Sequence, residues 1–230
     1  MSDRHSEVHR SFPPEAPRRS GCCSDYVIPP LVIVAIAAAV LVVAFRNPRS
    51  VPTAVSAASS SSVPSQIAPL FTPEVHYWGE AITRWAADAG LDPNLAAVVM
   101  QIESCGDPRA LSRSGAIGLF QVMPYHFAAA EAPYLPDTNA RRGLAYLSRA
   151  LEAADGDARL AFAGYNGGIS VIDRPEWTWP AETVRYAYWG RGIYAEALNG
   201  SATSARLDEW LAAGGASLCS RARQHLQLQD

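Results

Sequence analysis

The feature that most constrains this chain is an apolar stretch over residues 27–45, which contains no charged or hydrogen-bonding side chain. Its nineteen residues would extend roughly 28 Å as an α-helix, at about 1.5 Å per residue. That length matches the hydrocarbon core of a bilayer, which is about 30 Å thick. Because the stretch has no polar face, it does not fit a helix on the surface of a soluble domain. We therefore predict a single transmembrane helix, with the folded part of the chain on one side of it.

A cleaved secretory signal is the alternative interpretation of the same stretch. Small residues suited to cleavage, Val55-Ser56-Ala57, lie about ten residues beyond the apolar run, further than a signal peptidase usually reaches. The run is also long for a signal sequence. We favour an uncleaved anchor, and cleavage stays open as the alternative.

The distribution of arginines predicts the orientation of this helix. Four arginines precede it and two follow it, namely Arg4, Arg10, Arg18 and Arg19 against Arg46 and Arg49. Positively charged residues gather on the cytoplasmic side of membrane segments. Residues 1–26 are therefore expected to form a cytoplasmic tail, with the rest of the chain on the periplasmic or cell-wall side.

A linker and one folded domain are expected after the anchor. Residues 46–72 are rich in Ser, Ala and Pro and lack helical or strand periodicity, which is typical of a flexible linker. Residues 73–230 then form the domain, in which 13 Arg against 18 Asp plus Glu leave a net charge of −5. A nucleic-acid-binding domain would have the opposite balance, so we exclude that class.

The cysteines divide between the two sides of the predicted anchor. Cys22 and Cys23 precede it, and Cys105 and Cys219 follow it. Disulfides persist in oxidising compartments outside the cytoplasm. Since Cys105 and Cys219 are the only pair on the outer side, we predict that they form a disulfide between the C-terminal tail and the loop that follows residue 104.

The domain itself is predicted to be all-α. Asp92-Pro93 is typical of a helix start, and Leu95, Val98, Val99 and Ile102 then follow at helical spacing. Further helices are expected over residues 81–89, 139–153, 159–165, 181–198 and 204–213, several of them ended by glycine. No run alternates apolar and polar residues for long enough to predict a strand.

Glu103 lies at the end of one predicted helix, beside its apolar stripe. A carboxyl group in that position is half desolvated, which raises its pKa and keeps it protonated near neutrality, so it can act as a general acid. A solvated residue at the helix rim, or a capping partner, fits the helical pattern as well. The loop that follows contains Gly106, Gly115 and Gly118, and it places the amide of Gln121 among apolar neighbours. A buried amide needs hydrogen-bond partners, which either local backbone or a bound sugar could supply.

Three motifs in order carry a resemblance to a known family. They are "IES…GAIGLFQVMP" around Glu103, "GYNGG" at 164–168 and "PAETVRY" at 180–186, with "NARRGLAYL" between the first two. Together they resemble the lytic transglycosylases with an SLT domain, of the lysozyme-like superfamily, which includes goose-type lysozyme. The resemblance covers about residues 76–198 and implies an all-α lysozyme-like fold that acts on peptidoglycan glycan strands.

The resemblance also implies roles for individual residues. The family's catalytic glutamate falls on Glu103, and the tyrosine expected to hydrogen-bond it falls on Tyr165. Expected contacts with the sugar chain fall on Ser104, Gly118, Leu119, Phe120, Gln121, Asn166 and Glu182. Phe120 stands where Met is more usual, which leaves the details of sugar binding open. Without the resemblance, Tyr165 is also typical of a core tyrosine.

Late aromatic residues in the domain are more typical of a core than of a sugar site. They are Trp177, Trp179, Tyr186, Tyr188 and Trp189. We expect most of them to be buried and at most one to face a sugar.

The reaction of the family that the motifs resemble uses one carboxyl group, and the motifs supply one, that of Glu103. Glycoside cleavage usually uses two carboxyl groups, and Gly106 and Pro108 are expected to turn Asp107 away from Glu103. Glu103 would protonate the bond between N-acetylmuramic acid and N-acetylglucosamine and then deprotonate the muramyl 6-hydroxyl, which closes a 1,6-anhydro ring. No metal or organic cofactor is implied. Three alternatives stay open: a hydrolytic muramidase, a non-catalytic glycan-binding wall protein, and a phage-type wall-penetrating module.

Overall fold

The structure is a computed structural model that describes residues 66–229. The predicted cytoplasmic tail (1–26), the predicted anchor (27–45) and most of the predicted linker therefore lie outside the described residues. Within residues 66–229, no helix combines the length and apolar character needed to cross a membrane.

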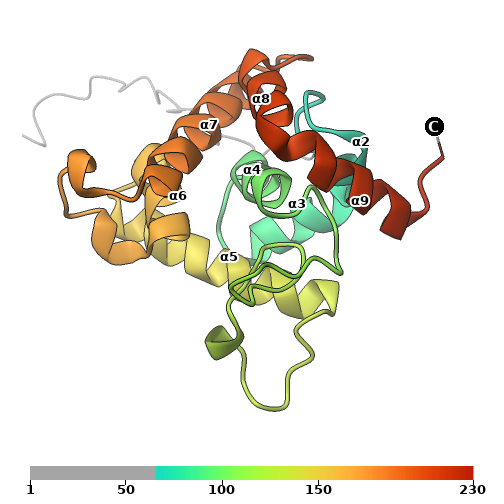
Figure 1. Cartoon of the computed structure of the whole chain (residues 1–230), viewed down its shortest axis with the longest axis horizontal. Coiled ribbons are helices and arrows are strands. Elements are labelled where there is room, and N and C mark those ends of the chain that lie inside the picture. Colours follow the sequence, from blue (N-terminus) through green and yellow to red (C-terminus); the bar gives the residue numbers. More distant parts are fainter. Residues whose placement is uncertain (1–65, 230) are drawn as a thin grey trace, which may run out of the picture. The chain divides into compact units, whose positions relative to one another are not determined.

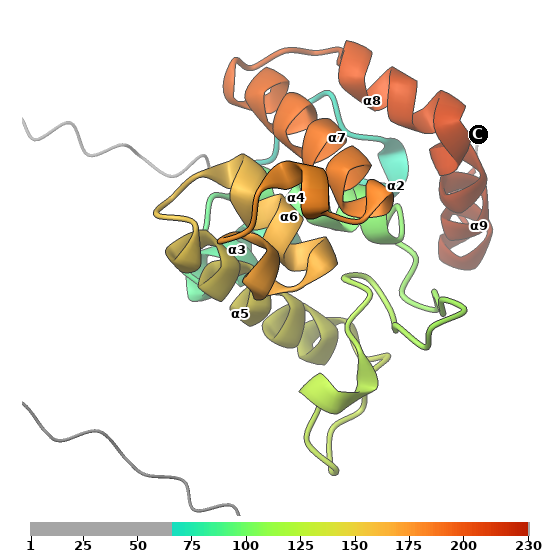
Figure 2. The ribbon, with the colours of Figure 1, turned by 60° about the vertical axis from the view of Figure 1, so that its left-hand side comes forward.

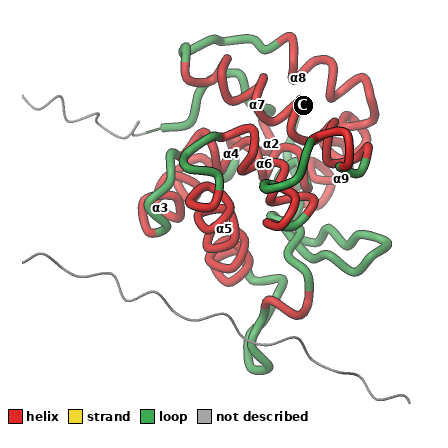
Figure 3. Tube along the Cα trace, turned by 90° about the vertical axis from the view of Figure 1, so that its left-hand side faces the viewer, coloured by secondary structure: helices red, strands yellow, loops and turns green. Residues whose placement is uncertain are grey.

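The described residues form helices joined by loops, as Figures 1 and 3 show. The α-helices are α2 (Pro73–His76), α3 (Gly79–Asp88), α4 (Pro93–Glu103), α5 (Pro136–Ala153), α6 (Ala158–Gly167), α7 (Ala181–Leu198), α8 (Ala205–Trp210) and α9 (Ala216–Leu226). Short 3₁₀ turns η1 (Pro124–His126), η2 (Ile169–Val171) and η3 (Glu176–Thr178) lie in the loops, and a π turn, η4 (Leu211–Gly215), joins α8 to α9. The described residues also contain two isolated β-bridges, Leu111–Ile117 and Ile117–Val122. The predicted all-α class is confirmed for the described residues.

Helix α4 lies at the centre of the domain, surrounded by the other helices (Figure 1). It begins as predicted, because the Asp92 side chain accepts hydrogen bonds from the Asn94 and Leu95 amides, and Pro93 needs no partner. The predicted single apolar stripe understates its burial. Every residue from Pro93 to Gln101 is buried, since helices pack on all of its sides. This dense packing holds Glu103, the last residue of α4, in a defined place.

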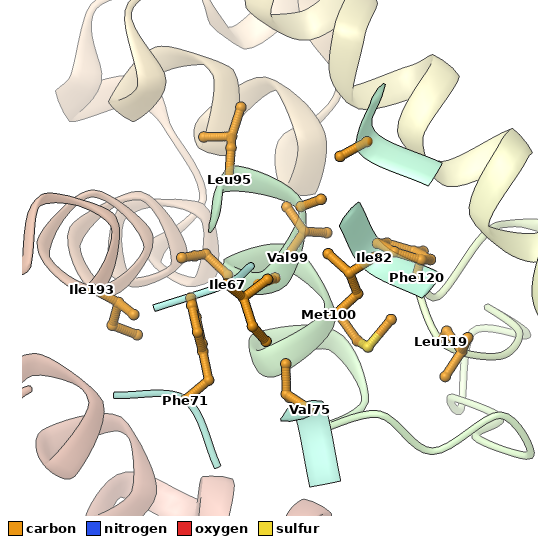
Figure 4. Close-up of a cluster of buried hydrophobic side chains, with 14 of the residues drawn as sticks. Ile67, Phe71, Val75, Ile82, Leu95, Val99, Met100, Leu119, Phe120 and Ile193 are labelled. Carbon is orange, nitrogen blue, oxygen red and sulfur yellow. The ribbon is translucent and has the colours of Figure 1, made fainter. Parts of the chain in front are cut away.

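The folded domain begins before residue 73. Ile67, Leu70 and Phe71 belong to the apolar core, and Figure 4 shows Ile67 beside Val99. The Ala68 amide donates to the Asn94 side chain over 2.7 Å. The end of the stretch that we assigned to the linker is therefore part of the domain, because its apolar residues cover the first turns of α4.

The C-terminal tail differs from its sequence-based prediction. The helix expected over residues 204–213 ends at Trp210, and a π turn with Gly214 at φ 126° redirects the chain into α9, which was not predicted. Cys219 of α9 is bonded to Cys105, with the two Cα atoms 4.9 Å apart, so the predicted disulfide is confirmed.

An ion pair and a contact between a histidine and a carboxylate hold α9 in addition to the disulfide. Arg223 binds the buried carboxylate of Glu74 in α2 over 2.7 Å, and His225 lies 2.8 Å from the carboxylate of Asp107. Figure 2 shows α9 close to α2 and to the loop that follows α4. Asp107 is thus turned toward α9, in agreement with the expectation that it points away from Glu103.

Candidate active site

Glu103 lies where a groove crosses the domain at the C-terminal end of α4. The groove has two arms, which share Glu103, Ser112, Gln121, Asn166 and Glu182. We call the first the α6 arm, about 560 Å³ in volume, and the second the tail arm, about 800 Å³. The α6 arm is lined in addition by Ser114, Ala116, Val122, Met123, Tyr125, His126, Gly143, Tyr146, Tyr165, Gly167, Gly168, Pro180 and Thr183. The tail arm is lined in addition by Ile102, Asp107, Arg109, Ala110, Leu111, Arg113, Arg185, Tyr186, Trp189, Trp210, Ala213, Leu218, Arg221 and His225.

A groove open on both sides of Glu103 suits a polymer that passes through it. A further hollow of about 810 Å³ between α3 and α5 contains none of the predicted site residues. We therefore place the candidate site in the groove.

Burial raises the pKa of Glu103 to about 8, against an ordinary value of 4.5. An interaction with the Tyr186 hydroxyl lowers this pKa, and the negative charge of Glu182 raises it. At neutral pH the Glu103 carboxyl is therefore protonated and can donate a proton to a bound substrate.

The tyrosine that faces Glu103 is Tyr186. Its hydroxyl is buried and makes no hydrogen bond of ordinary geometry within the described residues, although Glu103 lies close enough for each group to shift the pKa of the other. The expected bond from Tyr165 to Glu103 is not found. The Tyr165 hydroxyl instead donates to the backbone carbonyl of Phe120 over 2.7 Å. Tyr165 thus fixes the loop behind the acid, and Tyr186 is the hydroxyl available to the carboxyl group.

Four of the predicted sugar-binding residues support the groove from behind and do not line it. Ser104, Gly118, Leu119 and Phe120 are all buried. The Ser104 hydroxyl donates to the Leu119 carbonyl over 2.7 Å and accepts from the Gly106 amide. These residues attach the loop after α4 to the end of that helix, because their polar groups are already paired inside the protein.

Asn139 of α5 completes the support of this loop. Its side chain is buried, accepts from the Phe120 amide over 2.8 Å, and donates to the carbonyls of Ile117 and Pro133. Gly118 has φ 73°, and a Cβ atom there would lie 2.7 Å from the Asn139 amide nitrogen. The glycine is therefore required both by its backbone conformation and by the close approach of Asn139.

Gln121, Asn166 and Glu182 line both arms of the groove, as expected of substrate-binding residues. Gln121 has φ 45°, a conformation that few residues other than glycine adopt, and its side-chain amide donates to the Gly118 carbonyl over 3.0 Å. The Asn166 side-chain oxygen accepts from the Thr183 hydroxyl over 2.8 Å, which links α6 to α7.

Tyr186, Asn139 and Gly143 were not predicted as site residues. The sequence shows Tyr186 four residues after Glu182, one helical turn further along α7, and that spacing could have placed it on the face of Glu182. A Cβ atom at Gly143 would lie 2.5 Å from Phe120 Cβ and 3.1 Å from the Tyr165 hydroxyl, so α5 approaches the site only because this residue is glycine. Nothing in the linear sequence reveals that contact.

One set of metal-binding side-chain types comes together within residues 66–229, namely Glu74, Cys105 and Cys219. The two sulfur atoms are bonded to each other, and Glu74 is bound by Arg223, so this set has no thiolate to offer a metal.

The Glu182→Gln variant should shift the pH dependence of the candidate acid. Removing the negative charge of Glu182 removes one cause of the raised pKa of Glu103, so the alkaline decline of kcat/KM should move to lower pH. The measurement is a pH profile on glycan strands from pH 5 to 10. Glu80→Gln, at an exposed position of α3, is the matched control. An alkaline decline that stays in place or moves to higher pH would contradict the assignment of Glu103 as the acid whose pKa sets this decline.

Comparison with known proteins agrees with the motifs. Residues 80–178 match the family described as transglycosylase SLT domain. A transglycosylase from Enterobacteria phage PRD1 is 38% identical over 114 residues, which cover 47% of this chain and 40% of that protein. A solved structure of an inactive mutant of the lytic transglycosylase Slt from Pseudomonas aeruginosa is 26% identical, with a TM-score of 0.43, and the match covers 52% of this chain and 24% of that one.

The chain therefore spans less than half the length of each of these two relatives. The matched family region contains Glu103, the loop after α4, Tyr165 and Asn166, and it ends before Glu182, Tyr186 and the tail. The resemblance that the three motifs predict is confirmed for the matched region: residues 80–178 of this chain match the transglycosylase SLT domain family, and the chain is similar to a phage transglycosylase.

Proposed function

We propose that the protein is a peptidoglycan lytic transglycosylase, a lyase that cleaves the β-1,4 bond between N-acetylmuramic acid and N-acetylglucosamine and leaves 1,6-anhydro-muramic ends. The observation that carries the proposal is the position of Glu103, half-buried where the two arms of the groove meet, with a pKa that burial raises to about 8. The match of residues 80–178 to the transglycosylase SLT family supports it.

In the first step, the Glu103 carboxyl would donate its proton to the glycosidic oxygen as the bond from that oxygen to muramyl C1 breaks. The 2-acetamido group of the substrate would stabilise the positive charge at C1. In the second step, the Glu103 carboxylate would remove the proton of the muramyl 6-hydroxyl while that oxygen bonds to C1. Glu103 is then protonated again, and no water is consumed.

The raised pKa of Glu103 suits both steps. A carboxyl group with a pKa of about 8 is protonated at neutral pH and is also a stronger base than an ordinary carboxylate once it has lost its proton. The Tyr186 hydroxyl would stabilise the carboxylate that exists between the two steps.

Hydrolysis by a muramidase is the second candidate, because Glu182 adds a second carboxylate to the groove. That group could in principle activate a water molecule. We favour ring closure, since the 6-hydroxyl is part of the reacting sugar and an intramolecular nucleophile can reach an effective molarity of roughly 10⁵ M or more.

Mass spectrometry of digested peptidoglycan would test the proposal. We expect anhydro-muropeptides, each lighter by one water than the muramidase product and without a reducing muramic end. Products dominated by reducing ends that borohydride modifies would identify a hydrolase instead, and binding without any cleavage would identify a glycan-binding protein.

We also propose that residues 27–45 anchor the protein in the cell membrane, with the SLT domain outside the cytoplasm. The length and apolar character of that stretch and the arginines that precede it support this proposal. Carbonate extraction should leave the full-length chain in the membrane pellet. A soluble form that begins near Ala58 would show that the segment is a cleaved signal.

A further inference from the structure

The tail arm of the groove is lined by four arginines that have no partner among the described residues. Arg109 and Arg113 come from the loop after α4, Arg185 from α7 and Arg221 from α9. All four side chains are exposed, and within residues 66–229 none forms an ion pair, a side-chain hydrogen bond or a ring contact. Arg191 is the other described arginine with no such contact. Four of these five described arginines therefore line the tail arm.

The acidic residues of the tail arm do not balance this charge. Asp107, which contacts His225, and Glu182 are two carboxyl groups against four guanidinium groups. Burial raises the pKa of the third carboxyl group, Glu103, to about 8, so it is protonated at neutral pH. The α6 arm contains no arginine, so the two arms of the groove differ in the sign of their charge.

A cationic arm is unexpected in a domain whose residues 73–230 have a net charge of −5. The four guanidinium groups line one hollow of about 800 Å³ and outnumber the carboxyl groups beside them, so the arm favours an anionic ligand. The guanidinium groups of arginine bind carboxylates through two parallel hydrogen bonds. The chemistry of this arm therefore fits a ligand with several carboxylates.

We infer that the tail arm binds the carboxylates of the peptide stem attached to the muramyl residue. The inference rests on the proposed function, since the glycan backbone offers uncharged sugar hydroxyl and acetamido groups, whereas the stem carries the free carboxylates. The arm is continuous with Glu103, so a glycan strand in the groove would bring a stem into it.

The tail beyond the matched family region builds one side of this arm. Arg221 lies on α9 between Cys219, which is bonded to Cys105, and Arg223, which binds Glu74. Residues 80–178 match the family, so α9 is outside that match. The disulfide and the Arg223–Glu74 ion pair hold α9 against the domain, so that Arg221 and Arg185 line the same arm.

The test compares two substrates with the full-length protein in detergent. One is glycan strands that keep their peptide stems, and the other is the same strands after the free carboxylates of the stems have been converted to amides. The unmodified protein should cleave the strands with free carboxylates faster, and 0.5 M NaCl should reduce this preference, because salt screens exposed charges. The Arg185→Glu, Arg221→Glu double variant should lower the ratio of the two rates by about tenfold or more.

Arg191→Glu is the matched control for Arg185→Glu alone, because it makes the same change of charge on the same helix outside the groove. Arg113→Glu, in an exposed loop, is a second variant that does not depend on the packing of α9, and it should lower the ratio in the same direction. A double variant with the ratio of the unmodified protein, or equal rates of the unmodified protein on both substrates, would overturn the inference and leave the proposed function standing. Absence of anhydro products from both substrates would overturn the proposed function and the inference with it.

Discussion

The Glu103→Gln variant is expected to lose wall-degrading activity by at least about a hundredfold, while its fold stays intact. The amide keeps the size of the side chain and removes the proton that the cleavage step needs. Release of soluble muropeptides from purified peptidoglycan measures the loss, and circular dichroism checks the fold. Glu152→Gln, at an exposed position of α5, is the control that should keep full activity. Retained cleavage by Glu103→Gln would contradict the assignment of Glu103 as the general acid.

The same variant should be more stable than the unmodified protein at pH 9. The folded pKa of Glu103, about 8, lies above the ordinary value of 4.5, so the folded state binds this proton more tightly than the unfolded state. The stability linked to that proton is present in full below pH 4.5 and is lost as the pH rises through about 8. Glutamine does not titrate, so the variant escapes this loss.

The gain in stability of Glu103→Gln over the unmodified protein should therefore be larger at pH 9 than at pH 4. A gain on the order of 1 kcal/mol would raise Tm by roughly 2–4 °C for a domain of this size. Thermal melts of both proteins at the two pH values measure the difference. A gain that is the same at pH 4 and pH 9 would show that titration of Glu103 is not its cause.

Removal of the disulfide is expected to cause the largest loss of stability. Cys105 and Cys219 are 114 residues apart in the sequence, and opening a loop of that size gives the unfolded chain freedom worth on the order of 4–5 kcal/mol. Cys219→Ala should therefore lower the free energy of unfolding by about 3–5 kcal/mol. Urea denaturation measures the change, and the unmodified protein under reducing conditions should show a similar one.

Ser220→Ala is the control for this variant, because Ser220 is the exposed neighbour of Cys219 on α9. A loss below about 1 kcal/mol for Cys219→Ala would show that the ion pairs of Arg223 and His225 hold the tail without the disulfide. Cys219→Ala should also reduce activity, since α9 forms one side of the tail arm and Cys105 follows Glu103 by two residues.

Local sequence alone determines the helix that carries the acid. Asp92 and Pro93 start α4, an apolar run keeps it in the core, and Glu103 follows at the point where Ser104 and Cys105 leave helical geometry. These signals act between residues close in the sequence, so they can be read without the fold. The same reason explains the correct prediction of α7 at Ala181–Leu198 and of the end of α6 at Gly168.

Only the tertiary structure decides which groups reach Glu103. The tyrosine near its carboxyl is Tyr186, whereas Tyr165 is bound to the Phe120 carbonyl. Ser104 and the residues from Gly118 to Phe120 are buried. The Ser104 hydroxyl donates to the Leu119 carbonyl, and the Asn139 side chain of α5 binds the Phe120 amide and the Ile117 carbonyl. These contacts join residues that are far apart in the sequence, and hydroxyl groups on adjacent helices compete for the same partners.

The tail arm shows most clearly the difference between what local sequence determines and what only the tertiary structure decides. The sequence contains Arg109, Arg113, Arg185 and Arg221 at four unrelated positions, and no local pattern links them. They line one arm because the Cys105–Cys219 bond and the pairing of Asp107 with His225 bring α9 to the end of α4. The sequence by itself determines the helix that carries the proposed acid, Glu103. The packing of the tail decides the charge of the groove around that acid, because charges separated by about a hundred residues act together only when the fold places them side by side.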